Sequence, residues 1–295
     1  MTPGEPEKET TVTTAPHPID LEVLAVTAPR VAGRRALRLW TDPGDTSAVD
    51  RDRDVHERAR VDHLGHRGWR VAAYTWGEGA RPVLLVHGWG SRAARLAPLV
   101  RALTARGHTV VSWDAPGHGA TGGPAGTVLD ALAVARLLQE RHGDFAAVIG
   151  HSLGALFATH LVREGIRTDR LALLSAMADF EGTVDGFVAA HGWGPRVNRA
   201  LRRAIEDDLF DGDRDLWKRY ATVRDADALD VPVLLFHDVD DPLIPHAESV
   251  RILAAMGAGA RMVGTVGLGH NRILADPDVL ERLTAFVAPV RAEVW

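Results

Sequence analysis

The sequence predicts an α/β fold in which a mostly parallel sheet is flanked by helices. From Pro82 onwards, short continuous apolar runs alternate with longer segments in which apolar residues recur at helical spacing. Continuous apolar strands are typical of a sheet that is covered on both faces. The chain of 295 residues is 46% apolar, which is enough for the core of such a sheet. Ligands bind at the carboxyl ends of the strands in these sheets, so the residues that follow each strand are the first candidates for chemistry.

The regular part of the chain supplies six strands and five helices. The expected strands are Val83–Val86, Thr109–Trp113, Phe145–Ile149, Leu171–Leu174, Val231–Phe236 and Arg261–Val266. The expected helices are Ala93–Ala105, Val128–Leu138, Leu153–Val162, His246–Met256 and a last helix from Pro277 towards Val290. Before them, Val61 to Trp76 predicts a hairpin that turns near Gly65–Gly68.

The N-terminal part gives weaker signals. Met1 to Pro18 is rich in Thr, Pro and Glu and lacks the apolar stretch of a signal peptide, so residues 1–18 are predicted to be a disordered tail. Leu21 to Trp40 has a weak helical pattern. Thr41 to Asp54 is predicted to be a charged linker.

Composition excludes several classes of function. The net charge is -5 and the basic residues are interspersed with acidic ones, so the chain lacks the basic excess or basic stripe that is typical of nucleic-acid binding. No apolar run approaches the ~20 residues of a membrane span. The chain has no cysteine, which excludes disulfides and thiolate metal sites. We therefore expect a cytoplasmic protein with no nucleic-acid partner and no membrane span; the oligomeric state is not indicated.

The most specific motif follows the strand Phe145–Ile149. Residues 150–154 read G-H-S-L-G, which is G-x-S-x-G at a strand-to-helix junction, the context of a nucleophile elbow. The sharp turn needs small residues two positions on either side of the serine, and it holds Ser152 at a helix N-terminus. Ser152 is therefore the candidate nucleophile. The alternative is a tight turn in which Ser152 only caps the helix.

Three motifs in this order carry a family resemblance. His87–Gly90 reads H-G-W-G, Asp114–Gly119 reads D-A-P-G-H-G, and G-H-S-L-G follows. From about Trp69 to the C-terminus, the chain resembles the α/β-hydrolase superfamily, in particular its serine esterases and lipases. The resemblance implies an α/β-hydrolase fold with a small helical cap. Serine at position 152 separates the chain from dehalogenases and epoxide hydrolases of this fold, which use an aspartate nucleophile.

The resemblance also implies an oxyanion hole made of two backbone N–H groups, those of Trp89 and Leu153. The family uses the backbone here, so His87 is expected to be a buried turn histidine without a chemical role. Asp114–Gly119 is likewise expected to be a structural turn beside the site.

His270 is the general base that the resemblance implies. It follows the last expected strand in the run G-L-G-H, whose glycines are expected to form a flexible loop that carries the imidazole to the serine. Histidine suits this role because its ordinary pKa of ~6.5 is close to neutral pH. The alternative is an exposed loop histidine.

An acid should orient this imidazole, and it is expected after the strand Val231–Phe236. The family pattern D-x-x-V/I-P selects Asp241, which gives the chain order Ser152, Asp241, His270 of this superfamily. The alternatives left open are Asp238, Asp240 and, after the preceding strand, Asp179. A metal site at His237, Asp238 and Asp240 is disfavoured because no second cluster has ligand spacing.

About fifty residues separate the strand that ends near Ser175 from the strand that begins at Val231, many more than a crossover needs. Apolar spacing predicts three short amphipathic helices there, which the resemblance identifies as a cap over the active site. We expect a core of residues 19–176 and 230–295 with a cap of residues 177–229. The expected substrate-binding residues are Trp89, Phe180, Phe187, Trp193 and Trp217. The alternative is that the cap aromatics only anchor the cap to the core.

The function expected from this resemblance is hydrolysis of a carboxylic ester or thioester through an acyl-enzyme on Ser152, acting on a small-molecule ester or acyl substrate. No cofactor and no metal are expected. Two alternatives remain open. The same triad serves C–C bond hydrolysis or acyl transfer in biosynthetic pathways, and a hydrolase fold can also act as a non-catalytic binding protein.

Overall fold

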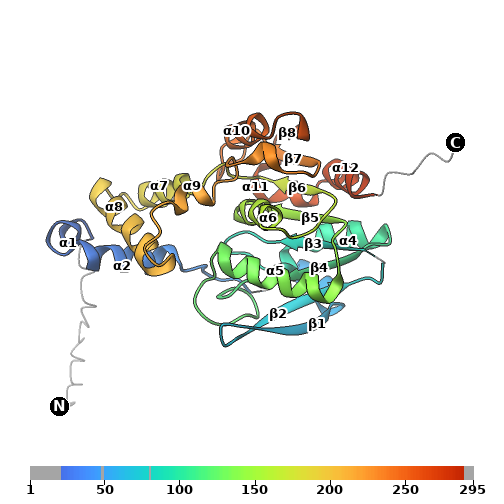
Figure 1. Cartoon of the computed structure of the whole chain (residues 1–295), viewed down its shortest axis with the longest axis horizontal. Helices are drawn as coiled ribbons and strands as arrows, with labels where there is room; N and C mark the ends of the chain where they lie inside the picture. Colours follow the sequence, from blue (N-terminus) through green and yellow to red (C-terminus); the bar gives the residue numbers. More distant parts are fainter. Residues whose placement is uncertain (1–20, 48–49, 80, 289–295) are drawn as a thin grey trace, which may run out of the picture.

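The computed structural model describes residues 21–47, 50–79 and 81–288, and within these ranges the chain forms one eight-stranded sheet (Figure 1). The strand order is β1-β2-β4-β3-β5-β6-β7-β8. The pairs β1–β2 and β2–β4 are antiparallel and the other pairs are parallel. The strands are β1 Arg60–His66, β2 Trp69–Trp76, β3 Pro82–Val86, β4 Thr109–Trp113, β5 Ala147–His151, β6 Leu171–Leu174, β7 Val233–Asp238 and β8 Ala260–Thr265. The mostly parallel sheet that the sequence predicts is confirmed.

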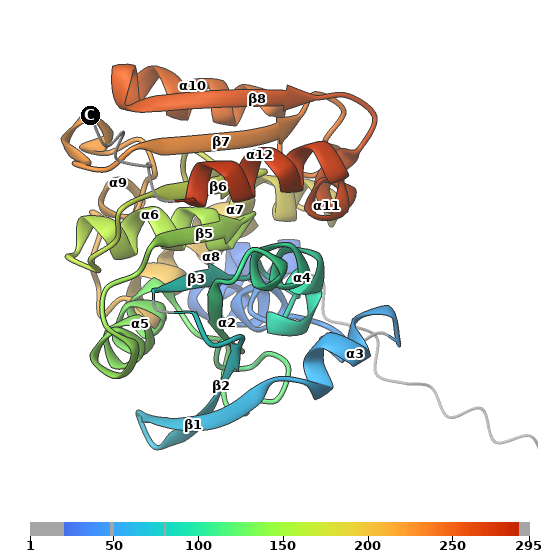
Figure 2. The same ribbon diagram turned by 90° about the vertical axis from the view of Figure 1, so that its right-hand side faces the viewer.

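Helices cover both faces of this sheet because the central strands are apolar on both sides. In β3, Leu84 and Val86 enter one core and Val83 and Leu85 enter the other. The helices on the first face are α5 Val128–His142, α6 Leu153–Arg163 and α10 His246–Met256. Those on the second face are α4 Ala97–Ala105 and α12 Pro277–Val287, which lie on the near side of the sheet in Figure 2.

A separate helical layer stands to the left of the sheet in Figure 1. Its members are α1 Leu21–Thr27, α2 Pro29–Trp40, α7 Glu181–Ala190, α8 Pro195–Ala204, the π-helical turn Ile205–Leu209 and α9 Leu216–Arg219. They share one apolar cluster. At the crossing of α2 and α8, a Cβ on Gly33 would lie 2.3 Å from Ala200 O, so the two backbones touch. The three expected helices therefore pack together with two N-terminal helices; the division into core and cap stays a prediction.

The chain after α2 differs from the expected charged linker. Asp50–Glu57 forms helix α3, and the Trp76 indole N–H donates to Val55 O at 2.8 Å. Val55 is buried and His56 packs on Tyr74, with 5.0 Å between ring centroids. Val55 is the single apolar residue of this segment, so the sequence showed no helical periodicity from which the helix could be predicted.

Two expectations concern residues that lie outside the described ranges. The tail predicted at residues 1–18 lies outside the described residues, and so does the end of the last helix near Val290; α12 ends at Val287. No helix in the described ranges combines the length and the apolar character that a membrane crossing requires.

Candidate active site

Ser152 occupies a strained turn between β5 and α6. Its φ is +57° and its ψ is −126°, a region that costs a non-glycine residue about 1–3 kcal/mol. Gly150 and Gly154 make the turn possible: a Cβ on Gly150 would lie 2.3 Å from Gly154 O, and one on Gly154 would lie 2.3 Å from Val86 O. The Ser152 N–H donates to Leu174 O at 2.9 Å, which ties the turn to β6. The hydroxyl is thereby held at the N-terminus of α6.

His270 and Asp241 form a buried hydrogen-bonded pair. His270 Nδ1–H donates to Asp241 Oδ2 at 2.7 Å, while Asp241 Oδ1 accepts the N–H groups of Leu243 and Ile244 at 2.9 and 3.0 Å. Burial raises the pKa of Asp241, but hydrogen bonds from His237, His270 and the two amides outweigh it and hold the pKa well below its usual range. Because the ionised carboxylate only accepts, the proton of neutral His270 stays on Nδ1 and Nε2 can accept another.

The other carboxylates considered for this role have different partners. Asp238 accepts hydrogen bonds from the Thr265 hydroxyl at 2.7 Å and from Leu268 N at 2.9 Å. Asp240 accepts from Gly267 N at 3.0 Å, and Asp179 pairs with Arg251 at 2.8 Å. Of the four aspartates, Asp241 is the one in contact with His270. Asp238 and Asp240 instead hold the segment that leads to His270.

His270 does not stand in a flexible loop, as the glycines had suggested, but in the short helix α11 Gly269–Arg272. The His151 Nε2–H donates to His270 O at 2.9 Å. Burial, and then the neighbouring His270, lower the pKa of His151 to about 4, so His151 is neutral at pH 7. The residue before the serine thus fixes the backbone of the candidate base, a contact that the motif alone gave no means to predict.

The two amides expected to bind an oxyanion are available. Neither Trp89 N–H nor Leu153 N–H donates to an acceptor in the described part of the chain. His87 is buried beside them: its Nδ1–H donates to Gly88 O at 2.8 Å and its Nε2 accepts Ala115 N–H at 3.0 Å. Both imidazole nitrogens are therefore used in the turn, as expected for a structural histidine.

The Asp114–Gly119 segment connects three parts of the fold through hydrogen bonds. Asp114 is buried and accepts hydrogen bonds from the Tyr74 hydroxyl, Ala93 N and Ala120 N at 2.8 to 2.9 Å. These contacts link β2, the start of the turn Ala93–Leu96 and the loop after β4. The segment stands beside the site without exposing its carboxylate.

Ser152 and His270 open on a cleft of about 1020 Å³, and a narrow apolar pocket of about 40 Å³ lies beside it. Phe187 lines the cleft, Phe180 lines the narrow pocket, and Trp89 lines both. Trp193 and Trp217 line neither of the two. Trp217 stacks on Phe180 at 5.1 Å, and Trp193 stacks on His191 at 4.5 Å between ring centroids. Three of the five aromatic residues expected to bind substrate thus lie at the site, and two pack within the helical layer.

Sequence reasoning missed Trp40. It is the last residue of α2, and its ring lies 6.1 Å from that of Trp89 and 5.7 Å from that of Phe180. It lines both the cleft and the narrow pocket. The helical pattern over Leu21 to Trp40 was visible, but nothing in it indicated which distant element the helix contacts.

Comparisons with known proteins bear on the family and the fold. Residues 77–207 match the family model of the serine aminopeptidases, S33. The chain is 34% identical over 179 residues to the dihydrolipoyllysine-residue acetyltransferase component of an acetoin cleaving system from Cupriavidus necator, and the match covers 57% of this chain and 44% of that protein. It is 30% identical over 206 residues to a pimeloyl-[acyl-carrier protein] methyl ester esterase from Chromobacterium violaceum, covering 58% of this chain and 80% of the esterase.

A solved structure has the same fold. An esterase from Pyrococcus furiosus superposes with a TM-score of 0.63 at 17% identity, over 83% of this chain and 94% of the esterase. This likeness concerns the arrangement of the sheet and its helices.

Proposed function

Since the chain belongs to the α/β-hydrolase superfamily, we propose that it hydrolyses a carboxylic ester or thioester through an acyl-enzyme on Ser152. The single observation that carries the proposal is the 2.7 Å hydrogen bond between His270 Nδ1 and Asp241 Oδ2 in a cleft that also exposes Ser152. That arrangement leaves His270 Nε2 as the proton acceptor that a serine nucleophile requires.

In the first half of the reaction, Ser152 Oγ attacks the carbonyl carbon while His270 Nε2 takes the hydroxyl proton. The N–H groups of Trp89 and Leu153 bind the oxyanion of the tetrahedral intermediate. When the intermediate collapses, the C–O or C–S bond breaks and His270 returns the proton to the leaving alcohol or thiol. Asp241 orients the imidazole and stabilises its charge without taking the proton.

In the second half, His270 takes a proton from water, which attacks the acyl-serine. Collapse of the second intermediate releases the carboxylic acid, and the proton returns to Ser152. This cycle uses side chains and backbone amides of the chain together with water.

The test is labelling and hydrolysis by the purified chain. A fluorophosphonate probe should label wild type and spare Ser152→Ala, and Ser152→Ala should lose at least ~1000-fold of p-nitrophenyl acetate hydrolysis. Ser47→Ala, an exposed serine outside both pockets, is the matched control and should keep both signals. Hydrolysis and labelling that survive in a folded Ser152→Ala variant would falsify the proposal.

Acyl transfer is the second candidate, because one relative is named as an acetyltransferase component. Transfer replaces water by an acceptor alcohol or thiol in the second half of the same cycle. Adding such an acceptor at millimolar concentration and analysing the products by mass spectrometry separates the two reactions. A transferase forms the acylated acceptor faster than the free acid.

A further inference from the structure

The cleft and the narrow pocket meet at the groups proposed to bind the carbonyl oxygen. Three residues line both spaces: Trp40, Trp89 and Leu153. Trp89 and Leu153 carry the two oxyanion amides of the proposed mechanism. A carbonyl bound by these amides therefore sits at the boundary between the two spaces, with one substituent in each.

His270 decides which substituent enters which space. It lines the cleft and does not line the narrow pocket. Because His270 has to deliver a proton to the leaving group, the alcohol or thiol must lie on the cleft side of the carbonyl. The acyl chain then lies in the narrow pocket.

The two spaces differ in chemistry. Apart from Thr41 and Thr127, the side chains that line the narrow pocket are apolar or aromatic, and they include Val128, Leu156, Phe157, Leu209, Phe210 and Tyr220. The cleft is also lined by charged side chains, among them Asp42, Arg95, Arg272 and Asp276. An apolar acyl group and a larger, polar leaving group match this division.

The volumes set a limit on the acyl chain. A pocket of about 40 Å³ is small beside the cleft of about 1020 Å³, so it favours a short acyl chain. Acyl groups from acetyl to butyryl are the short chains that we expect there. A longer chain meets the aromatic wall.

Trp40 stands at the boundary. Its ring packs between Trp89 and Phe180, and it comes from a helix that precedes the segment matched by the family model, residues 77–207. The α2 backbone is held against Ala200 at Gly33, which fixes the position of its last residue. We propose that the narrow pocket binds a short apolar acyl group and that Trp40, supplied by the N-terminal helix, sets the chain-length limit. This inference rests on the proposed function.

The experiment measures kcat/KM for p-nitrophenyl acetate, butyrate and octanoate. Wild type should prefer butyrate or acetate over octanoate by at least ~10-fold, since one misplaced methylene changes kcat/KM by about 10- to 200-fold. Trp40→Ala joins the two spaces and should raise the octanoate-to-butyrate ratio by at least ~10-fold.

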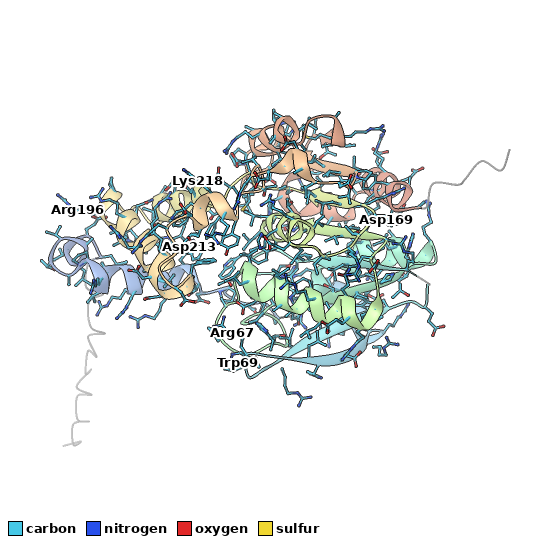
Figure 3. All side chains as sticks on the ribbon, in the orientation of Figure 1. Arg67, Trp69, Asp169, Arg196, Asp213 and Lys218 are labelled. Atoms are coloured by element: carbon cyan, nitrogen blue, oxygen red, sulfur yellow. The ribbon has the colours of Figure 1, made fainter. Side chains whose placement is uncertain are left out.

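Trp69→Ala is the matched control. Trp69 is a half-exposed tryptophan on β2, away from the helical layer where Arg196 and Lys218 lie (Figure 3). The octanoate-to-butyrate ratio of this variant should stay within ~2-fold of wild type, as for an ordinary surface substitution.

A second variant covers the case in which Trp40→Ala loosens α2. Leu209 is half-buried in the wall of the narrow pocket, and Leu209→Phe fills space without removing a contact of α2. This variant should lower the butyrate-to-acetate ratio by at least ~5-fold, because one to two carbon positions are lost.

The outcomes separate the two proposals. If acetate is hydrolysed and Ser152 is labelled, but wild type prefers octanoate or both folded variants keep the wild-type ratios, the acyl-pocket inference is overturned and the proposed function stands. If no ester is hydrolysed in a Ser152-dependent way, the proposed function fails, and the inference fails with it. Ratios that move in the two expected directions support both.

Discussion

His237 Nε2 lies 3.5 Å from Asp241 Oδ2, the same oxygen that accepts the hydrogen bond from His270. The ring of His237 is buried and held at both nitrogens. Its Nε2–H donates to Ile244 O at 2.9 Å, and its Nδ1 lies 2.6 Å from Ser249 Oγ. His237 thus ties the strand end to the segment whose amides bind the other oxygen of Asp241. It is a positioning residue for the candidate acid.

We expect His237→Phe to lower kcat by about 10-fold with KM nearly unchanged, because a misdirected Asp241 affects the chemical step and not substrate binding. His237→Gln keeps a donor for Ile244 O and should recover most of the loss. Steady-state kinetics with p-nitrophenyl acetate measures both parameters. Equal impairment of the two variants, with KM raised in each, would show that His237 only packs.

Two neighbouring aspartates make a sharp comparison. Asp241→Asn places an amide beside Nδ1 and favours the His270 tautomer whose Nε2 already carries a proton, so kcat should fall by at least ~100-fold. Asp240→Asn keeps an acceptor for the Gly267 N–H and should cost less than ~5-fold, as expected for a residue outside the proton relay. Measured rates in the reverse order would mean that the acid has been misassigned by one residue.

His160 makes a testable contribution to the pH dependence of stability. It is buried in α6 against Tyr220, its Nδ1 has no partner in the described part of the chain, and burial lowers its pKa to about 4. The unfolded histidine, with a pKa of ~6.5, binds more protons between these two values. Stability therefore rises with pH across that window and is lost as pH falls from about 6.5 to about 4.

The measurement is urea unfolding at pH 5 and pH 7. His160→Leu removes this titration, so the free energy of unfolding of the variant should change less between the two pH values, by up to about 1.4 kcal/mol per pH unit. His87 and His151 have similarly lowered pKa values and remain in the variant, so a smaller dependence persists. Parallel pH profiles for variant and wild type would contradict the assignment to His160.

Gly33 and Gly186 test the packing of the helical layer, because both are glycines within helices. A Cβ on Gly33 meets Ala200 O at 2.3 Å, whereas a Cβ on Gly186 meets nothing within 4 Å. Gly33→Ala should destabilise the protein by about 1–3 kcal/mol through overpacking. Gly186→Ala should stabilise it by about 0.5–1 kcal/mol through the entropy of the unfolded chain. Thermal melts of the two variants that shift in the same direction would refute the close crossing of α2 and α8.

The sequence was informative where one residue type has a local geometric requirement. The glycines around Ser152 predicted the turn, and the order of apolar runs predicted the parallel sheet. Asp241 was selected by the family pattern D-x-x-V/I-P that the resemblance supplied, and it is the aspartate that contacts His270. The turn and the acid were indicated by short motifs of neighbouring residues, and the sheet was indicated by apolar runs that alternate with helical segments.

Contacts between distant segments were not predictable in this way. An amphipathic helix such as α2 shows that one face is buried, but its sequence does not specify the partner, so Trp40 could not be assigned to the site. The same limit applied to His151 and His237, whose roles depend on a backbone oxygen or a side chain brought near by the fold. Trp217 shows the opposite error, because it was expected at the site and packs elsewhere. A large apolar residue in the insertion can be buried against Phe180 as readily as against a substrate, so its residue type alone did not show which one it contacts.

The pairing of α2 with α8 has a consequence for biosynthesis. Ala200 leaves the ribosome about 170 residues after Gly33, and at about 5–20 residues per second this interval is about 10 to 30 s. During that interval the face of α2 that packs on α8 at Gly33 lacks its native partner. Nascent chains of intermediate length should therefore engage chaperones, and slowing translation before α8 should lower the yield of folded protein more than slowing it afterwards.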